Sequence, residues 1–146
     1  MRHATLLTIL FLSLIFPFTS NTYANEQADK VVGSWQINAT VNAEVVYKNW
    51  TGTITVNKQG KTLTAVLDWA SENGEWHVVQ DMSVSKNGKE VTLQGTSVNI
   101  ITKPEHMTEY LPDTFKFNLD DKTNNTIPVM AGDTKGTSMT FSINKL

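Results

Sequence analysis

The chain has 146 residues, with 12 Lys and Arg against 14 Asp and Glu, a net charge of −2 and no cysteine. This length is typical of one domain. The weak negative charge offers no basic footprint for nucleic acid, and the absence of cysteine excludes disulfides, thiolate metal sites and thiol catalysis.

The N-terminal stretch differs in composition from everything after it. Arg2 and His3 precede an apolar run from Ala4 to Phe18, and Thr22-Tyr23-Ala24 places small residues at the two positions that a signal peptidase reads. The run is shorter than the roughly 20 apolar residues that a membrane span needs. We therefore expect a secretory signal peptide. An uncleaved N-terminal anchor is the alternative.

This assignment divides the chain into a signal peptide at 1–24, a flexible leader at 25–30 and a single β-barrel domain at 31–146. It predicts an exported protein, periplasmic or secreted, with no membrane span after the signal is cleaved.

The stretch from Val31 to Val41 has the clearest pattern in the chain. After Gly33 and Ser34, large or apolar side chains alternate with polar ones, so that one face carries Trp35, Ile37, Ala39 and Val41. A period of two indicates a strand with one buried face.

Further stretches of the same period follow, separated by turns. We expect strands over 50–56, 62–69, 76–85, 90–95, 97–102, 114–120, 127–130 and 138–146, with a shorter extended piece from Glu44 to Tyr47. Asn73-Gly74 and Asn87-Gly88 are strong hairpin signals, and Gly95 is expected to mark a bulge or bend.

The stretch from Lys103 to Asp113 interrupts this rhythm. It contains Pro104 and Pro112 around a polar middle, so it is expected to be a loop, with or without one helical turn from Glu105 to Tyr110. Sequential hairpins on either side predict an all-β, antiparallel up-and-down meander. Such a sheet removes its edges by closing into a small barrel of about eight strands. A two-sheet β-sandwich is the alternative.

Gly33-x-Trp35 at the start of the first strand, followed by a meander, resembles the lipocalin and fatty-acid-binding (calycin) barrels. The chain is more similar still to the lipocalin-like β-domain of many secreted bacterial proteins, through Gly52-Thr53, Gly60-Lys61, Gly88–Thr92 and Gly132–Thr137. The resemblance implies a barrel fold rather than a chemistry. Lipocalins often carry an Arg near the closing strand that packs on the Trp, and after Arg2 this chain has no Arg.

The chain's four tryptophans lie at strand starts or ends, on the face expected to point inward. They are interpreted either as core and barrel plugs or as the lining of a pocket for an apolar or flat ligand; an exposed aromatic patch for a protein partner is a third interpretation. Gln80 would be one of the few polar groups orienting a ligand. The predicted lining comprises Trp35, Trp50, Leu67, Trp76, Val78, Gln80, Met82, Phe115, Phe117 and Phe141.

One patch on the opposite face carries groups capable of acid–base chemistry. If Trp69 pairs with Trp76, Asp68 lies opposite His77, and Asp81 falls on the same patch opposite Thr64. A carboxylate beside an imidazole can orient a general base. Because no nucleophile or oxyanion-hole motif accompanies them, no catalytic residue is assigned.

His106-x-x-Glu109, with Glu105 beside it, has the spacing of metal ligands on one helical turn. A closed site needs more ligands, and His77 is the only other histidine after the signal. A solvated loop is the preferred interpretation, and no metal or cofactor is predicted.

These observations favour a non-enzymatic exported barrel that binds a small apolar ligand in an aromatic-lined interior. The alternative is a protein–protein interaction or inhibitor module of the cell envelope. It would have a solid core and an exposed patch or loop, such as Lys103–Asp113, that meets an envelope or extracellular protein. A hydrolase using Asp68 and His77 is a third hypothesis.

Overall fold

The computed structural model describes residues 30–41, 49–121, 126–131 and 139–146, with the backbone alone for 41, 126–131 and 139–142. The expected signal peptide and the extended piece at 44–47 lie outside these ranges. The elements within them are strands: β1 (Gly33–Val41), β2 (Asn49–Gln59), β3 (Thr62–Ser71), β4 (His77–Asn87), β5 (Glu90–Thr102), β6 (Thr114–Asn118), β7 (Thr126–Ala131) and β8 (Met139–Lys145).

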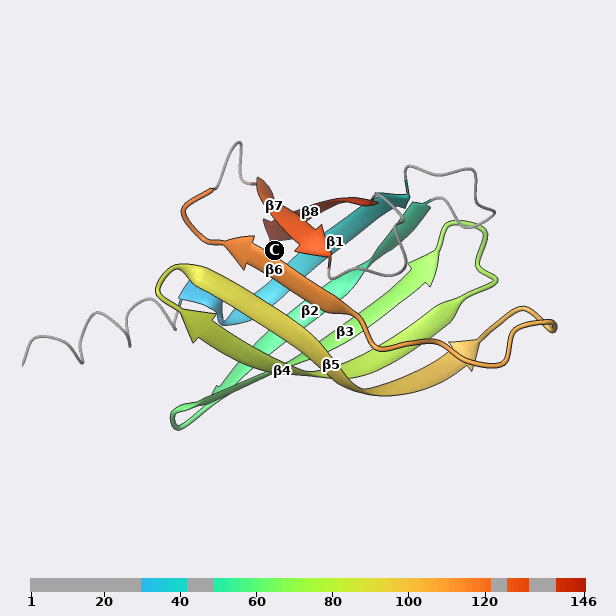
Figure 1. The fold of residues 1–146 in the computed structure, drawn as a ribbon, viewed down its shortest axis with the longest axis horizontal. Coiled ribbons are helices and arrows are strands. Elements are labelled where there is room, and N and C mark those ends of the chain that lie inside the picture. The colour runs from blue at the N-terminus through green and yellow to red at the C-terminus, as the bar shows by residue number, and fades with distance from the viewer. Residues whose placement is uncertain (1–29, 42–48, 122–125, 132–138) are drawn as a thin grey trace, which may run out of the picture.

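The strands form one curled antiparallel sheet in chain order (Figure 1). Each strand pairs with the next along the chain. The hydrogen-bonded order then returns from β8 to β1, with Trp35 opposite Lys145 and Val41 opposite Met139. The predicted all-β, antiparallel meander is thus confirmed.

Two ends of this sheet differ in how their strands are joined. At the left of Figure 1, two-residue turns join β2 to β3 and β4 to β5. Gly60 and Gly88 adopt φ values of 62° and 61° there, which glycine adopts without strain. At the right lie the turn from Ser71 to Trp76 and the loop 103–113. We call the end with the two-residue turns the Trp35 end, and the end with the loop 103–113 the Tyr110 end.

Alternation along the strands buries the predicted face. Leu67 and Val78 are fully buried, while their neighbours Val66 and Asp68 are exposed. Each large apolar side chain removed from water contributes roughly 1.5–3 kcal/mol. The buried apolar residues of the described chain are Val31, Trp35, Ile37, Ala39, Trp50, Ile54, Val56, Ala65, Leu67, Trp69, Trp76, Val78, Met82, Val91, Leu93, Phe115, Phe117 and Ile143.

The register between β3 and β4 corrects one prediction. Trp69 lies opposite Val78, not Trp76, and Thr64 lies opposite Ser83, not Asp81. The reason is the length of the turn, in which the Ser71 backbone N donates to the Trp76 carbonyl at 3.0 Å across four residues. Asn-Gly occupies the middle of this turn, with Gly74 at a φ of 72°.

Two further features follow β4. The predicted bulge at Gly95 is confirmed, since Gly95 lies opposite Met82 and Ser97 opposite Asp81, with Thr96 as the extra residue. In the loop, a turn at Glu105 and His106 replaces the optional helical turn. None of the helical structure within the described residues has the length and apolarity to cross a membrane.

Candidate functional site

Five aromatic rings gather at the Tyr110 end. The Trp50 ring lies 5.0 Å from Trp69 and 6.0 Å from Tyr110, while Trp76 lies 5.4 Å from Tyr110 and Trp69 5.8 Å from Phe115, all between centroids. The pairs are tilted or edge-on, the arrangements that aromatic quadrupoles favour. The sheet supplies Trp50, Trp69 and Phe115, and Trp76 directly precedes β4. Tyr110 comes from the loop, which therefore completes the cluster.

A partly buried polar network adjoins these rings. Gln80, fully buried on β4, donates through Nε2 to Asp113 Oδ2 at 2.5 Å and accepts the Asp113 backbone N–H on Oε1 at 2.9 Å. The Tyr110 hydroxyl donates to the same Oδ2 at 3.0 Å. Gly95 completes the network, its backbone N donating to the Asp113 carbonyl at 2.8 Å. Asp113 is thereby fixed on both its main chain and its side chain.

Gly95 is required for this approach. A Cβ there would lie 2.7 Å from Gln80 Oε1 and 2.9 Å from Pro112 Cβ, both closer than side chains tolerate. The absence of a side chain at the bulge thus lets the end of the loop lie against β4 and β5. The sequence predicted the bulge but did not indicate this contact between the bulge and the loop.

The electrostatics of Asp113 are unusual for an aspartate. Burial raises its pKa from 3.8 to about 6, against the hydrogen bonds from Gln80 and Tyr110, which favour the ionised form. Burial also raises the pKa of Tyr110, and the Asp113 charge and hydrogen bond add to the rise, while Trp69 opposes it. Near neutral pH the site therefore holds a neutral phenol beside a largely ionised, desolvated carboxylate.

A surface hollow of about 460 Å³ adjoins the cluster at Trp50. Its rim is polar: Asn49 Nδ2 donates to Glu72 Oε2 at 2.6 Å, and Thr51 Oγ1 donates to Asn38 Oδ1 at 2.9 Å. Ser71 also lines it. The hollow brings solvent to the edge of the aromatic cluster.

The predicted ligand-lining residues divide between the cluster and the rest of the core. Trp50, Trp76, Phe115 and Gln80 belong to the Tyr110 end, whereas the buried Trp35 lies at the opposite end. The Phe141 side chain lies outside what the structure describes. The remaining predicted residues are buried in the sheet wall: Leu67, Val78, Met82 and Phe117.

Sequence reasoning missed three members of the site: Trp69, Tyr110 and Asp113. Trp69 was expected inside but was not assigned to the site. Tyr110 and Asp113 fell in a segment interpreted as a solvated loop. The available signal was a large aromatic residue at 110 followed by Leu111 and Pro112, which is unusual in a wholly solvated loop.

At the Trp35 end, a different arrangement surrounds the tryptophan of the Gly-x-Trp motif. The Trp35 indole N–H donates to the Val31 carbonyl at 2.8 Å. Lys145 Nζ lies 5.5 Å from the Trp35 ring centroid, within the range of a cation–π contact. Gly33, at a φ of 124°, gives the Lys145 chain room to pass.

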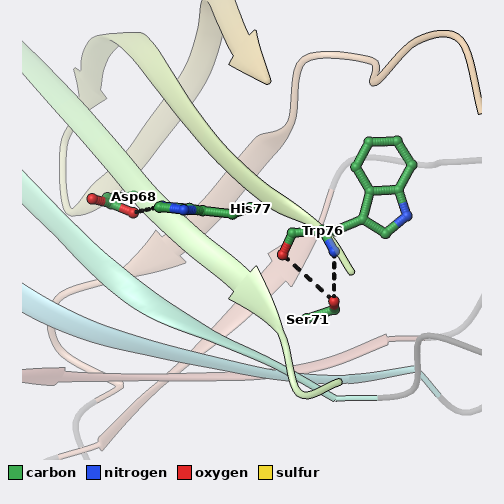
Figure 2. Close-up of polar contacts among 4 residues, drawn as sticks. All are labelled: Asp68, Ser71, Trp76 and His77. Atoms are coloured by element: carbon green, nitrogen blue, oxygen red, sulfur yellow. Dashed lines mark hydrogen bonds and ion pairs between the residues drawn. The ribbon is translucent and has the colours of Figure 1, made fainter. Parts of the chain in front are cut away.

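Asp68 and His77 do meet, but on the outer face of the sheet (Figure 2). His77 Nε2 and Asp68 Oδ1 lie 2.8 Å apart, as diagonal rather than directly opposite residues, and the side chains are 38% and 60% exposed. Ser71 is turned toward Trp76, whose backbone N–H it accepts at 3.0 Å. Ser71 is therefore not in position to act as a nucleophile with the pair in Figure 2.

The other predicted groups are separate from this pair. The Asp81 carboxylate accepts a hydrogen bond from Ser97 Oγ at 2.8 Å. Within the described ranges, no group of three or more His, Asp or Glu side chains is placed to hold a metal ion, which includes the segment around His106.

Comparison of the chain with protein-family models, with curated proteins and with solved structures found no match. The site must therefore be interpreted from its own geometry.

Proposed function

We propose that this protein is an exported, non-enzymatic β-barrel that binds a small molecule with a flat, apolar body at the Tyr110 end. The observation that carries the proposal is the aromatic cluster, which is joined through the Tyr110 hydroxyl to a half-buried carboxyl group and a fully buried amide. Small-molecule sites combine apolar walls with a few convergent polar groups. Carboxyl groups with raised pKa values also concentrate at functional sites.

The proposal includes a lipocalin-like closed barrel of eight strands. The β1–β8 register supports closure, and Lys145 over Trp35 supports the resemblance, because it supplies a cation where lipocalins often have an Arg.

Export by a signal peptide at 1–24 is part of the same proposal. N-terminal sequencing of the protein from the producing cell's exported fraction is expected to begin at Asn25. Recovery of the intact N-terminus from the membrane fraction would favour the uncleaved anchor instead.

Binding is tested with a neutral apolar fluorophore, N-phenyl-1-naphthylamine, titrated into the mature protein. We expect saturable fluorescence enhancement with energy transfer from tryptophan. Trp76→Leu should weaken it by about tenfold, the loss of one aromatic contact surface. The matched control is Val66→Thr on the exposed outer face, which should bind as the parent does. A folded protein that binds neither this fluorophore nor the naphthyl probes described below would contradict the proposal.

A second candidate function, docking of a protein partner, has its own observation. Ile101, Met107 and Leu111 are 50%, 36% and 56% exposed around a loop whose base is fixed at Asp113. Preorganised apolar side chains suit an apolar depression on another protein. A partner recovered by cross-linking in the native compartment should be lost with the double variant Met107→Ser and Leu111→Ser, while binding of the fluorophore is retained.

A further inference from the structure

The carboxylate of Asp113 is half-buried at the edge of the aromatic cluster, without a contacting cation in the part of the chain that the structure describes. Its side-chain partners are a neutral amide, Gln80, and a neutral phenol, Tyr110. Withdrawing a carboxylate from water without an opposite charge is costly, which the raised pKa of Asp113 reflects. The ionised form of Asp113 therefore destabilises the folded protein unless a bound cation neutralises it.

Tyr110 shows what shape the site accepts. Its flat ring contacts Trp50 and Trp76, and its hydroxyl donates to Asp113 Oδ2. It is thus a planar body with a hydrogen-bond donor at one end. Because Tyr110 belongs to a loop, its side chain can move out of the cluster without breaking a strand pairing. The hydrogen bonds of the Asp113 backbone N–H and carbonyl, to Gln80 and Gly95, keep the end of the loop in place.

We propose that the ligand is a flat aromatic compound carrying a protonated amine, which displaces Tyr110, places its ring between Trp50 and Trp76 and donates from its ammonium group to Asp113. This inference rests on the proposed function and specifies its ligand class. The aromatic faces attract the cation, and the ammonium–carboxylate bond is stronger than the phenol–carboxylate bond that it replaces.

The groups that face Asp113 define the pH range of this recognition. They are Gln80 from β4, Gly95 from β5 and Tyr110 from the loop, of which only Tyr110 titrates. Burial raises the Tyr110 pKa, so it stays neutral. Asp113 is protonated below about pH 6. An amine should therefore be preferred above this pH, and the preference should fade below it.

The experiment compares three probes of one shape by calorimetry with the mature protein at pH 7.5: 2-(1-naphthyl)ethylamine, 2-(1-naphthyl)ethanol and 1-naphthylacetate. The amine should bind about tenfold more tightly than the alcohol, the size expected of one desolvated cation contact, and the acetate least tightly. At pH 5 the amine and the alcohol should bind within about twofold of each other.

Variants locate the effect. Asp113→Asn should remove the preference for the amine but keep binding of the alcohol, whereas Asp68→Asn, a matched change on the outer face, should keep the preference. Tyr110→Ala should tighten binding of the amine, because no side chain then has to be displaced. Lys48→Gln and Lys135→Gln, which lie outside the described residues, should leave the preference unchanged.

The outcomes separate the two proposals. Equal binding of amine and alcohol at pH 7.5, or a preference that survives Asp113→Asn, overturns this inference and leaves the proposed function standing. If none of the three probes nor the neutral fluorophore binds the folded protein, the proposed function itself is overturned.

Discussion

At the Trp35 end the indole N–H bonds to a main-chain carbonyl and the ring meets an exposed lysine, whereas at the Tyr110 end a half-buried carboxyl group is bonded to a tyrosine of the aromatic cluster. The first end closes with two-residue turns and an indole bonded to a main-chain carbonyl. The second depends on side chains from a loop, four strands and a turn. Regular strands and turns pair their own backbone N–H and C=O groups and thereby stabilise the fold. The end that withdraws an ionisable group from water, at a cost in stability, is where function is expected.

The largest expected effect tests the wall on which the Tyr110 end is built. Gly52 faces Trp69 across β2 and β3, and a Cβ there would lie 2.2 Å from Trp69 Cβ and 2.3 Å from the Asp68 carbonyl oxygen. Gly52→Ala must separate two paired strands and should reduce the free energy of unfolding by about 3 kcal/mol or more. Urea unfolding followed by tryptophan fluorescence measures this.

The control for that variant is Gly60→Ala. Gly60 adopts a φ of 62° with open space around its Cβ position, so alanine meets only backbone strain. It should lose about 1 kcal/mol. Equal losses at the two positions would show that the close approach of Gly52 and Trp69 is not what makes glycine necessary.

The next prediction concerns how the free energy of unfolding depends on pH, which should differ between the two ends. Because the Asp113 pKa is raised from 3.8 to about 6 in the folded protein, the stability that its protonated form supplies is full below 3.8 and is lost as the pH rises through 6. Asp113→Asn cannot ionise. Between pH 4 and pH 8 the parent should therefore lose about 2 kcal/mol relative to this variant, after allowance for partial solvent access.

Urea unfolding of both proteins across this pH range gives the difference directly, since all other titrating groups are common to both. A difference that stays constant from pH 4 to pH 8 would mean that Asp113 titrates in the folded protein as it does in the unfolded chain.

The Trp35 end supplies the contrasting case. Trp35→Phe removes the indole N–H that donates to Val31 and leaves the buried Val31 carbonyl oxygen without that donor, and it weakens the contact with Lys145. A loss of about 1–2 kcal/mol is expected. It should be the same at pH 5 and pH 8, because the hydrogen bond involves no titrating group. If the loss of stability depended strongly on pH, the Trp35 end would not differ from the Tyr110 end in its pH dependence.

The two ends were also unequally predictable from the sequence. Trp35 and its strand follow a period of two, and the same period assigned Leu67, Val78 and Phe115 to the interior, where they lie. The bulge could be predicted because Gly95 stands inside a strand pattern. These features depend on local spacing alone.

The Tyr110 end depends on contacts that local spacing does not encode. Asp113 bonds to Gln80, 33 residues away, and a loop has no periodicity from which to predict that Tyr110 turns inward. The β3–β4 register was predicted wrongly for a related reason, since Asn-Gly indicates a turn without specifying whether two or four residues close it.

The smallest effect concerns the outer wall, where Asp68 and His77 form an ion pair or hydrogen bond at 2.8 Å. Both side chains are more than a third exposed, and solvent weakens such pairs to about 0.5 kcal/mol. A double-mutant cycle of Asp68→Asn and His77→Gln should return a coupling energy of that size, which added salt reduces. A coupling energy several times larger would mean that the pair is shielded from solvent. The outer wall would then have to be considered as a site alongside the Tyr110 end.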